Sequence, residues 1–142
     1  LAMNHIAINK KIKIIYSAHP NPDVIQSENK YLKKKQNIKR IGNLNYMDFI
    51  YLMSKSDLIL SDSGGIQEEA PSLGKPNLVL RDFTERPETI IKKTSVLVGT
   101  NKEKILREFN KIYYSKKLYS YMSKKRNLYG DGKAYLKIIR KL

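Results

Sequence analysis

The sequence predicts an α/β domain built around a parallel sheet. Short apolar runs alternate five times with stretches of helix-forming residues, an order typical of parallel strands joined by right-handed crossovers. The run at residues 58–60 is too short for a core helix and is bounded by polar turn residues, as expected of a buried parallel strand. The 142 residues contain no repeat or linker, so we expect residues 1–142 to form one domain around one core.

The first part of the chain supplies two of these strands. Residues 12–16 and 38–41, both rich in isoleucine, are predicted as the first and second strands. Residues 1–9 are amphipathic, as the end of a helix would be, and residues 24–35 are predicted to form an exposed helix whose lysines lie in solvent. Residues 46–55 carry apolar side chains at helical spacing, so most of that stripe is predicted to be core.

The second part supplies three more strands and the remaining helices. Strands are predicted at residues 58–61, 77–80 and 96–99. Helices are predicted at residues 66–73, 87–93, 102–113, 117–125 and 133–142. Gly74 and Pro76 are typical stops for the first of these helices. Asp131 lies between Gly130 and Gly132, and we interpret this stretch as a turn that permits positive φ.

A glycine turn joins the third predicted strand to its helix. Ser63, Gly64 and Gly65 lie at this junction, where the first N–H groups of a helix have no internal partner and face the positive end of the macrodipole. The turn is therefore a candidate phosphate site. Glu69 follows Gly65 by one helical turn, so its carboxylate lies on the same face and can accept both hydroxyls of a ribose. The glycine spacing fits neither GxGxxG nor a Walker A loop, so a tight turn without a ligand remains open.

A charged stretch, residues 81–88, follows the fourth predicted strand. Ligands of open α/β sheets bind beyond the carboxyl ends of the strands, and Arg86 can clamp a phosphate there with two hydrogen bonds. The alternative is that the charges only pair with each other. We expect Asp82 and Glu85 to orient Arg86 and Arg81 rather than to act on a substrate.

Two further side chains are candidates from their positions. His19 follows the first strand and would share a sheet edge with Ser63 and Arg86 if all strands are parallel, although a lone histidine is more often structural. Phe49 can stack on a base, although its periodicity predicts a core residue. Glu68 points about 100° away from Glu69 on the helix, so we do not expect it to be a ligand.

Composition narrows the possible partners. The net charge of +15 would suit nucleic acid. However, most of the 28 basic residues are lysines spread along the chain, which makes nucleic acid the less favoured partner. The positive charge would still help to attract an anionic nucleotide. The absence of cysteine excludes disulfides and thiolate metal sites. No long apolar run or signal segment is present, so we expect a cytoplasmic protein without a membrane partner.

Several motifs together resemble one family. The motif SDSGGIQEEAPSLGKP at residues 61–76, followed by LRDFTERPE at residues 80–88, resembles the non-hydrolysing bacterial UDP-N-acetylglucosamine 2-epimerases. The similarity extends to HPNP, LVGT and NLYGDG at residues 19–22, 97–100 and 127–132. Nearly the whole chain therefore resembles the C-terminal half of that family. It departs from the usual family residues at Asn77, Phe83 and Leu128, none of which makes a proposed contact.

The resemblance implies a Rossmann-like, doubly wound parallel sheet that forms the C-terminal half of a two-domain, glycosyltransferase-B-like fold. The catalytic acids would lie in an N-terminal domain that this sequence does not contain. The implied reaction interconverts UDP-N-acetylglucosamine and UDP-N-acetylmannosamine by elimination and re-addition of UDP. The resemblance implies that the complete enzyme is a homodimer and that it uses no metal or organic cofactor. We expect this chain to be inactive alone. Three alternatives stay open, namely the UDP-binding half of a related glycosyltransferase, a truncated UDP-binding protein without catalysis, and a nucleic-acid-binding protein.

The resemblance also assigns roles to individual residues. Ser63, Gly64 and Gly65 would bind the pyrophosphate. The remaining assignments are Glu69 for the ribose, Phe49 for the uracil, Arg86 for the diphosphate charge, and His19 as a catalytic residue at the leaving phosphate.

Overall fold

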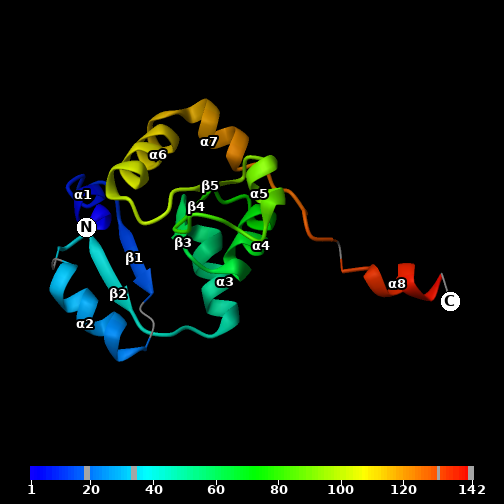
Figure 1. Ribbon diagram of the computed structural model, residues 1–142, viewed down its shortest axis with the longest axis horizontal. Coiled ribbons are helices and arrows are strands. Elements are labelled where there is room, and N and C mark those ends of the chain that lie inside the picture. The colour runs from blue at the N-terminus through cyan, green and yellow to red at the C-terminus, as the bar shows by residue number, and fades with distance from the viewer. Residues whose placement is uncertain (18–19, 33–34, 131, 141–142) are drawn as a thin grey trace.

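The computed structural model describes residues 1–17, 20–32, 35–130 and 132–140, and its strands are all parallel (Figure 1). The strands are β1 (Ile14–Ser17), β2 (Ile38–Ile41), β3 (Ile59–Ser61), β4 (Asn77–Val79) and β5 (Ser95–Leu97). Each lies within two residues of a predicted strand at either end. The predicted α/β fold with parallel strands is confirmed.

Within the described residues, the strand ladders form two sheets. β1 pairs with β2, and the second sheet has the order β3-β4-β5. The two sheets share one core, because Ile14 of β1 and Leu60 of β3 pack against the same cluster of buried side chains. Since every ladder is parallel, the carboxyl ends of β3, β4 and β5 lie at one edge, and the loops that follow these strands meet there.

Helices follow the strands in the predicted order. They are α1 (Ala2–Ile6), α2 (Pro22–Tyr31), α3 (Tyr46–Lys55), α4 (Gly64–Leu73), α5 (Pro87–Ile91), α6 (Lys102–Tyr114), α7 (Lys116–Met122) and α8 (Ala134–Ile139). Asn45 and Asn101 start α3 and α6 by accepting a hydrogen bond from a backbone N–H of the first turn. α4 begins two residues earlier than predicted, so Gly64 and Gly65 lie inside its first turn instead of in a loop before it.

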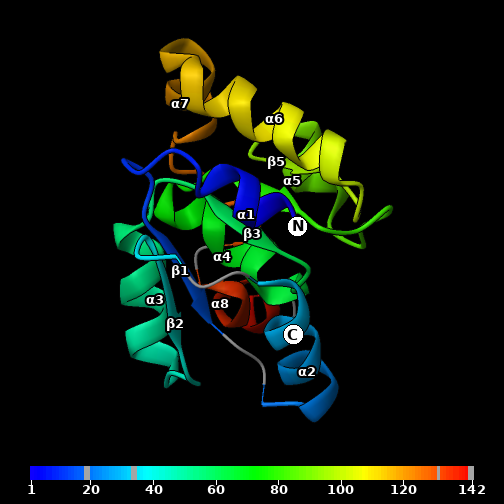
Figure 2. The same cartoon turned by 90° about the vertical axis from the view of Figure 1, so that its left-hand side faces the viewer.

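Helices cover both faces of the β3-β4-β5 sheet, which confirms the doubly wound arrangement (Figures 1 and 2). On one face, side chains of α6 and α7 form a core cluster with Leu78 and Val98. On the other face, Met53 of α3, Ile59 and Ala70 of α4 form a second cluster. The second cluster packs α4 against the sheet through Ala70, and α4 carries the candidate phosphate turn at its N-terminus.

The far end of α4 is closed by a later segment of the chain. Gly74 ends the helix with φ 68°, and a Cβ at this position would lie 2.5 Å from the Ser123 carbonyl oxygen. The Arg126 N–H donates to the Pro71 carbonyl oxygen at 2.9 Å. Only glycine combines the left-handed backbone with this close approach, so the residues after α7 pack directly on the end of α4.

The chain then leaves the sheet, and α8 lies apart from the other helices (Figure 1). Its large apolar side chains, among them Tyr135, Ile138 and Ile139, are exposed. Among the described residues, no helix combines the length and the apolar character that crossing a bilayer requires.

Asn77 is the one position in β4 where a buried polar side chain conflicts with its surroundings. It is 0% exposed, and in the described part of the chain neither Oδ1 nor Nδ2 has a hydrogen-bond partner. A buried polar group without a partner costs about 1–3 kcal/mol. We therefore expect Asn77→Val to raise the free energy of unfolding by about this amount, measured by urea denaturation. The shape-matched control Asn77→Asp should lower it, and a less stable Val variant would contradict the expectation.

Candidate functional site

The site begins where β3 meets α4. Ser63 is the N-cap of α4, and its own N–H donates to Ser61 Oγ at 3.0 Å. The exposed Ser63 side chain makes no capping hydrogen bond, unlike the asparagines that cap α3 and α6. The first turn of α4 therefore keeps N–H donors that its N-cap side chain does not use, and these donors suit an anion.

The two glycines leave space beside this helix start. Neither Gly64 nor Gly65 has a positive φ. A Cβ on Gly64 would meet no described atom within 4 Å, and one on Gly65 would meet only Ser63 Oγ at 3.9 Å. Glycine in a helix costs about 0.5–1 kcal/mol relative to alanine, and the described fold gains nothing from it at these two positions.

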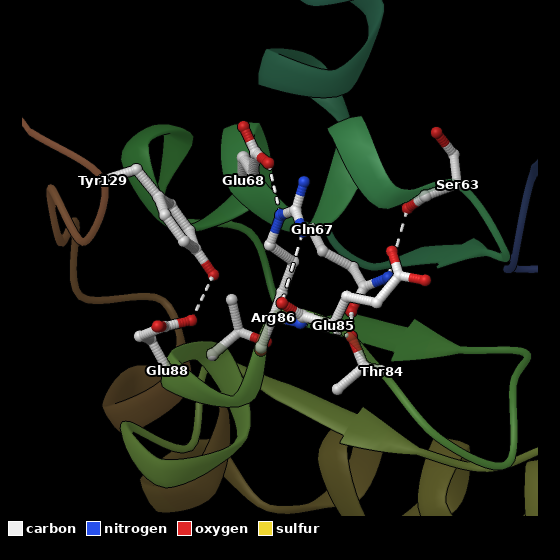
Figure 3. Close-up of polar contacts among 9 residues, drawn as sticks. Ser63, Gln67, Glu68, Thr84, Glu85, Arg86, Glu88 and Tyr129 are labelled. Atoms are coloured by element: carbon white, nitrogen blue, oxygen red, sulfur yellow. Dashed lines mark hydrogen bonds and ion pairs between the residues drawn. The ribbon is translucent and has the colours of Figure 1, made fainter.

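Arg86 lies next to α4, at the N-cap of α5. Its Nε donates to a carboxylate oxygen of Glu68 in an ion pair, and its Nη1 donates to the Glu85 carbonyl oxygen at 3.2 Å (Figure 3). The hydrogen bond and the negative charge of Glu68 raise the pKa of Arg86. The Arg86 side chain is 34% exposed.

The expected partners of the two arginines were wrong in part. Glu68, and not the Asp82 or Glu85 carboxylate, orients the Arg86 side chain, while Glu85 contributes its backbone oxygen. The reason is the helical rotation that separates Glu68 from Glu69, because it turns Glu68 toward α5. Arg81 donates from Nε to the Asp62 carbonyl oxygen at 2.5 Å.

Glu69 of α4 and Phe49 of α3 both lie where these two helices contact each other. The Tyr46 hydroxyl of α3 interacts with the Glu69 carboxylate, and this interaction raises the pKa of Tyr46. Phe49 is partly buried and packs against the cluster of Met53, Ile59 and Ala70. Phe49 therefore contributes to the hydrophobic core, as its periodicity predicts, and stacking of Phe49 on a base stays a prediction.

The NLYGDG motif returns to the same region. Tyr129 donates from its hydroxyl to Glu88 Oε2 at 3.3 Å (Figure 3). Burial raises the pKa of Tyr129 to about 12, and the negative charge of Glu88 adds to the effect. Gly130 and Gly132 have φ of 111° and 76°, as the predicted turn requires. Two predicted positions, His19 and Asp131, lie outside the described residues.

Sequence reasoning missed Gln67 and Thr84. Gln67 is 1% exposed, and its amide contacts both the Ser63 carbonyl and the Thr84 hydroxyl. One signal was available, because Gln67 lies one turn before Ala70 and is a polar residue on the buried face of an otherwise well-packed helix. Among the described residues, no group of three or more His, Cys, Asp or Glu side chains is placed to hold a metal ion.

Known proteins match the chain over nearly its full length. It is 51% identical over 139 residues to UDP-N-acetylglucosamine 2-epimerase of Campylobacter jejuni, covering 97% of this chain and 36% of that protein. The Escherichia coli K12 enzyme of the same name is 46% identical over 134 residues, covering 94% and 36%. The chain therefore spans about a third of the length of these relatives.

Solved structures agree with this relationship. UDP-GlcNAc 2-epimerase from Neisseria meningitidis bound to UDP-GlcNAc superposes with a TM-score of 0.89 at 41% identity, covering 99% of this chain and 38% of that one. An S. aureus MnaA–UDP co-structure superposes with a TM-score of 0.89 at 40% identity, covering 97% and 38%. The family described as UDP-N-acetylglucosamine 2-epimerase matches residues 1–142. The chain belongs to the UDP-N-acetylglucosamine 2-epimerase family.

Proposed function

We propose that this chain is the UDP-binding part of a UDP-N-acetylglucosamine 2-epimerase. The observation that carries the proposal is the arrangement around α4, whose first turn keeps unused donors while its second turn holds Arg86 through Glu68. A backbone anion site on α4 and a guanidinium that the same helix holds through Glu68 suit a diphosphate. The relatives solved with UDP-GlcNAc and with UDP support the same ligand.

In this proposal each candidate residue has a separate task. The pyrophosphate accepts hydrogen bonds from the Ser63 hydroxyl and from the N–H groups of Gly64 and Gly65. Arg86 neutralises part of the diphosphate charge. The remaining tasks are ribose binding by Glu69, uracil stacking by Phe49 and assistance to the leaving phosphate by His19.

The complete enzyme would invert C2 of UDP-N-acetylglucosamine by eliminating UDP and adding it back. This chain would hold UDP while it is detached, so that its return to C1 remains effectively intramolecular. Donors fixed in advance around the developing phosphate anion would stabilise the departure of UDP. The rest of the protein would supply the acids and bases that act at the sugar, in a cytoplasmic homodimer without metal or organic cofactor.

Calorimetry with the chain tests the proposal. We expect binding of UDP, with UDP-N-acetylglucosamine only marginally tighter, because the groups that contact the sugar would lie in the rest of the protein. Exchange of the C2 proton in heavy water should require that remaining part. A folded chain that shows no binding at millimolar UDP would contradict the nucleotide site, and exchange catalysed by the 142 residues alone would contradict the division of labour.

A further inference from the structure

A buried amide connects the two segments that would bind the diphosphate. Gln67 Nε2 donates to the Ser63 carbonyl oxygen at 3.4 Å, and Gln67 Oε1 accepts from Thr84 Oγ1 at 2.5 Å (Figure 3). The Gln67 side chain comes from α4, whereas Thr84 lies in the loop between β4 and α5. One side chain that both donates and accepts therefore bridges the start of α4 and the next loop.

Thr84 extends this bridge to Arg86. The Thr84 hydroxyl donates to Gln67 and accepts from the Arg86 N–H at 3.0 Å. The three hydrogen bonds run in one direction, from the Arg86 N–H through the Thr84 hydroxyl and the Gln67 amide to the Ser63 carbonyl. Hydrogen bonds arranged in such a chain polarise and strengthen one another in a buried site.

The ends of this chain are the N-cap residues of two helices. Ser63 caps α4 and Arg86 caps α5. The neighbouring residue Glu68 holds the Arg86 guanidinium. α4 therefore fixes the Arg86 backbone through Gln67 and Thr84 and the Arg86 side chain through Glu68, which sets the separation between the guanidinium and the glycine turn.

We infer that Gln67 and Thr84 are positioning residues for diphosphate binding, an inference that rests on the proposed function. They touch no part of the ligand in this proposal and act through Ser63 and Arg86. Stability alone does not require them, because replacing both partners of a buried hydrogen bond by apolar groups of similar shape is often nearly neutral. A purely structural role and a positioning role therefore predict different effects on ligand binding.

The test compares Thr84→Val, which keeps the shape and loses the hydroxyl, with Thr84→Ser, which keeps the hydroxyl. UDP and uridine affinities of the chain are measured by calorimetry. We expect Thr84→Val to weaken UDP binding roughly three- to tenfold, as the loss of a net hydrogen bond implies, with uridine binding unchanged. Thr84→Ser should bind UDP within about twofold of the original chain, since it retains the hydrogen-bonding group. Gln67→Met, similar in length but without the amide, should reproduce the Val result.

Each other outcome decides against a specific statement. Equal weakening of UDP and uridine, or UDP binding unchanged in both the Val and Met variants, would overturn the positioning role. Failure of Thr84→Ser to restore affinity would also overturn it, because the hydroxyl would not be the acting group. Absence of UDP binding by the unmodified folded chain would instead contradict the proposed function and remove any diphosphate to position.

Discussion

Replacement of Arg86 by alanine is expected to weaken UDP binding by about ten- to a hundredfold and to leave uridine binding nearly unchanged. A hydrogen bond to a charged group contributes about 1.5–3 kcal/mol, and each 1.4 kcal/mol or so is a tenfold change in affinity. Uridine is the ligand control, because it lacks the phosphates that Arg86 would contact. The UDP affinity of Arg86→Lys should lie between that of the original chain and that of Arg86→Ala, since lysine keeps the charge and loses the planar donor fork.

Glu68→Gln separates this role from simple ion pairing. If Arg86 only formed a partly exposed pair with Glu68, either replacement would cost about 0–1 kcal/mol of stability and leave UDP affinity intact. If Arg86 binds phosphate, Glu68→Gln keeps the guanidinium in place for UDP and costs less affinity than Arg86→Ala. Equal UDP affinity in the original chain and the Ala variant would exclude Arg86 as the phosphate ligand and make Arg81 the next candidate.

The second large effect is expected at Gly64, where stability and binding should change in opposite directions. Gly64→Ala should raise the free energy of unfolding by about 0.4–1 kcal/mol, because its φ is not positive and the new methyl group meets no described atom. The same methyl group would occupy space that the pyrophosphate needs. Crowding of this kind costs about 1–3 kcal/mol, so UDP binding should weaken roughly fivefold to a hundredfold.

Gly42→Ala is the matched control for Gly64→Ala. Gly42 also lacks a positive φ, and a methyl group added there would have no described atom within 4 Å, but Gly42 precedes α3 and not α4. The replacement should change the free energy of unfolding to a similar small extent and leave UDP binding alone. Unchanged UDP affinity in Gly64→Ala would show that the nucleotide does not approach the first turn of α4.

The order of elements was predictable from the sequence, because period and length distinguish buried strands from helices. The start of α4 was not, since glycine has low helix propensity and its helical conformation here depends on the packing of α4, through Ala70, against Ile59 of β3. α8 shows the opposite case. Its residues have helical character, and Ala134–Ile139 is indeed a helix, but the described chain provides no surface that covers its apolar side chains.

The candidate site was predictable only in its parts. Motif position identified Ser63, Gly64 and Arg86, because each follows a predicted strand. Their connections were not predictable, because the pairing of Arg86 with Glu68 and the contacts of Gln67 depend on how α4 rotates against α5. Helical spacing predicts which residues share a face of the helix, but it does not predict which neighbouring element packs against that face.

The packing of Gly74 against Ser123 bears on how small a nucleotide-binding module cut from this fold can be. α4 contains Pro71, which cannot donate a backbone hydrogen bond within the helix, and the Arg126 N–H binds the Pro71 carbonyl from outside. A designer who stopped the chain after α6 would keep every proposed ligand of UDP and remove the backbone that closes α4. The helix would then be free to fray from its far end, and the donors at its start would have to be ordered by the nucleotide itself, at the expense of affinity. The smallest useful module therefore extends through Arg126, well past the last residue that the nucleotide would touch.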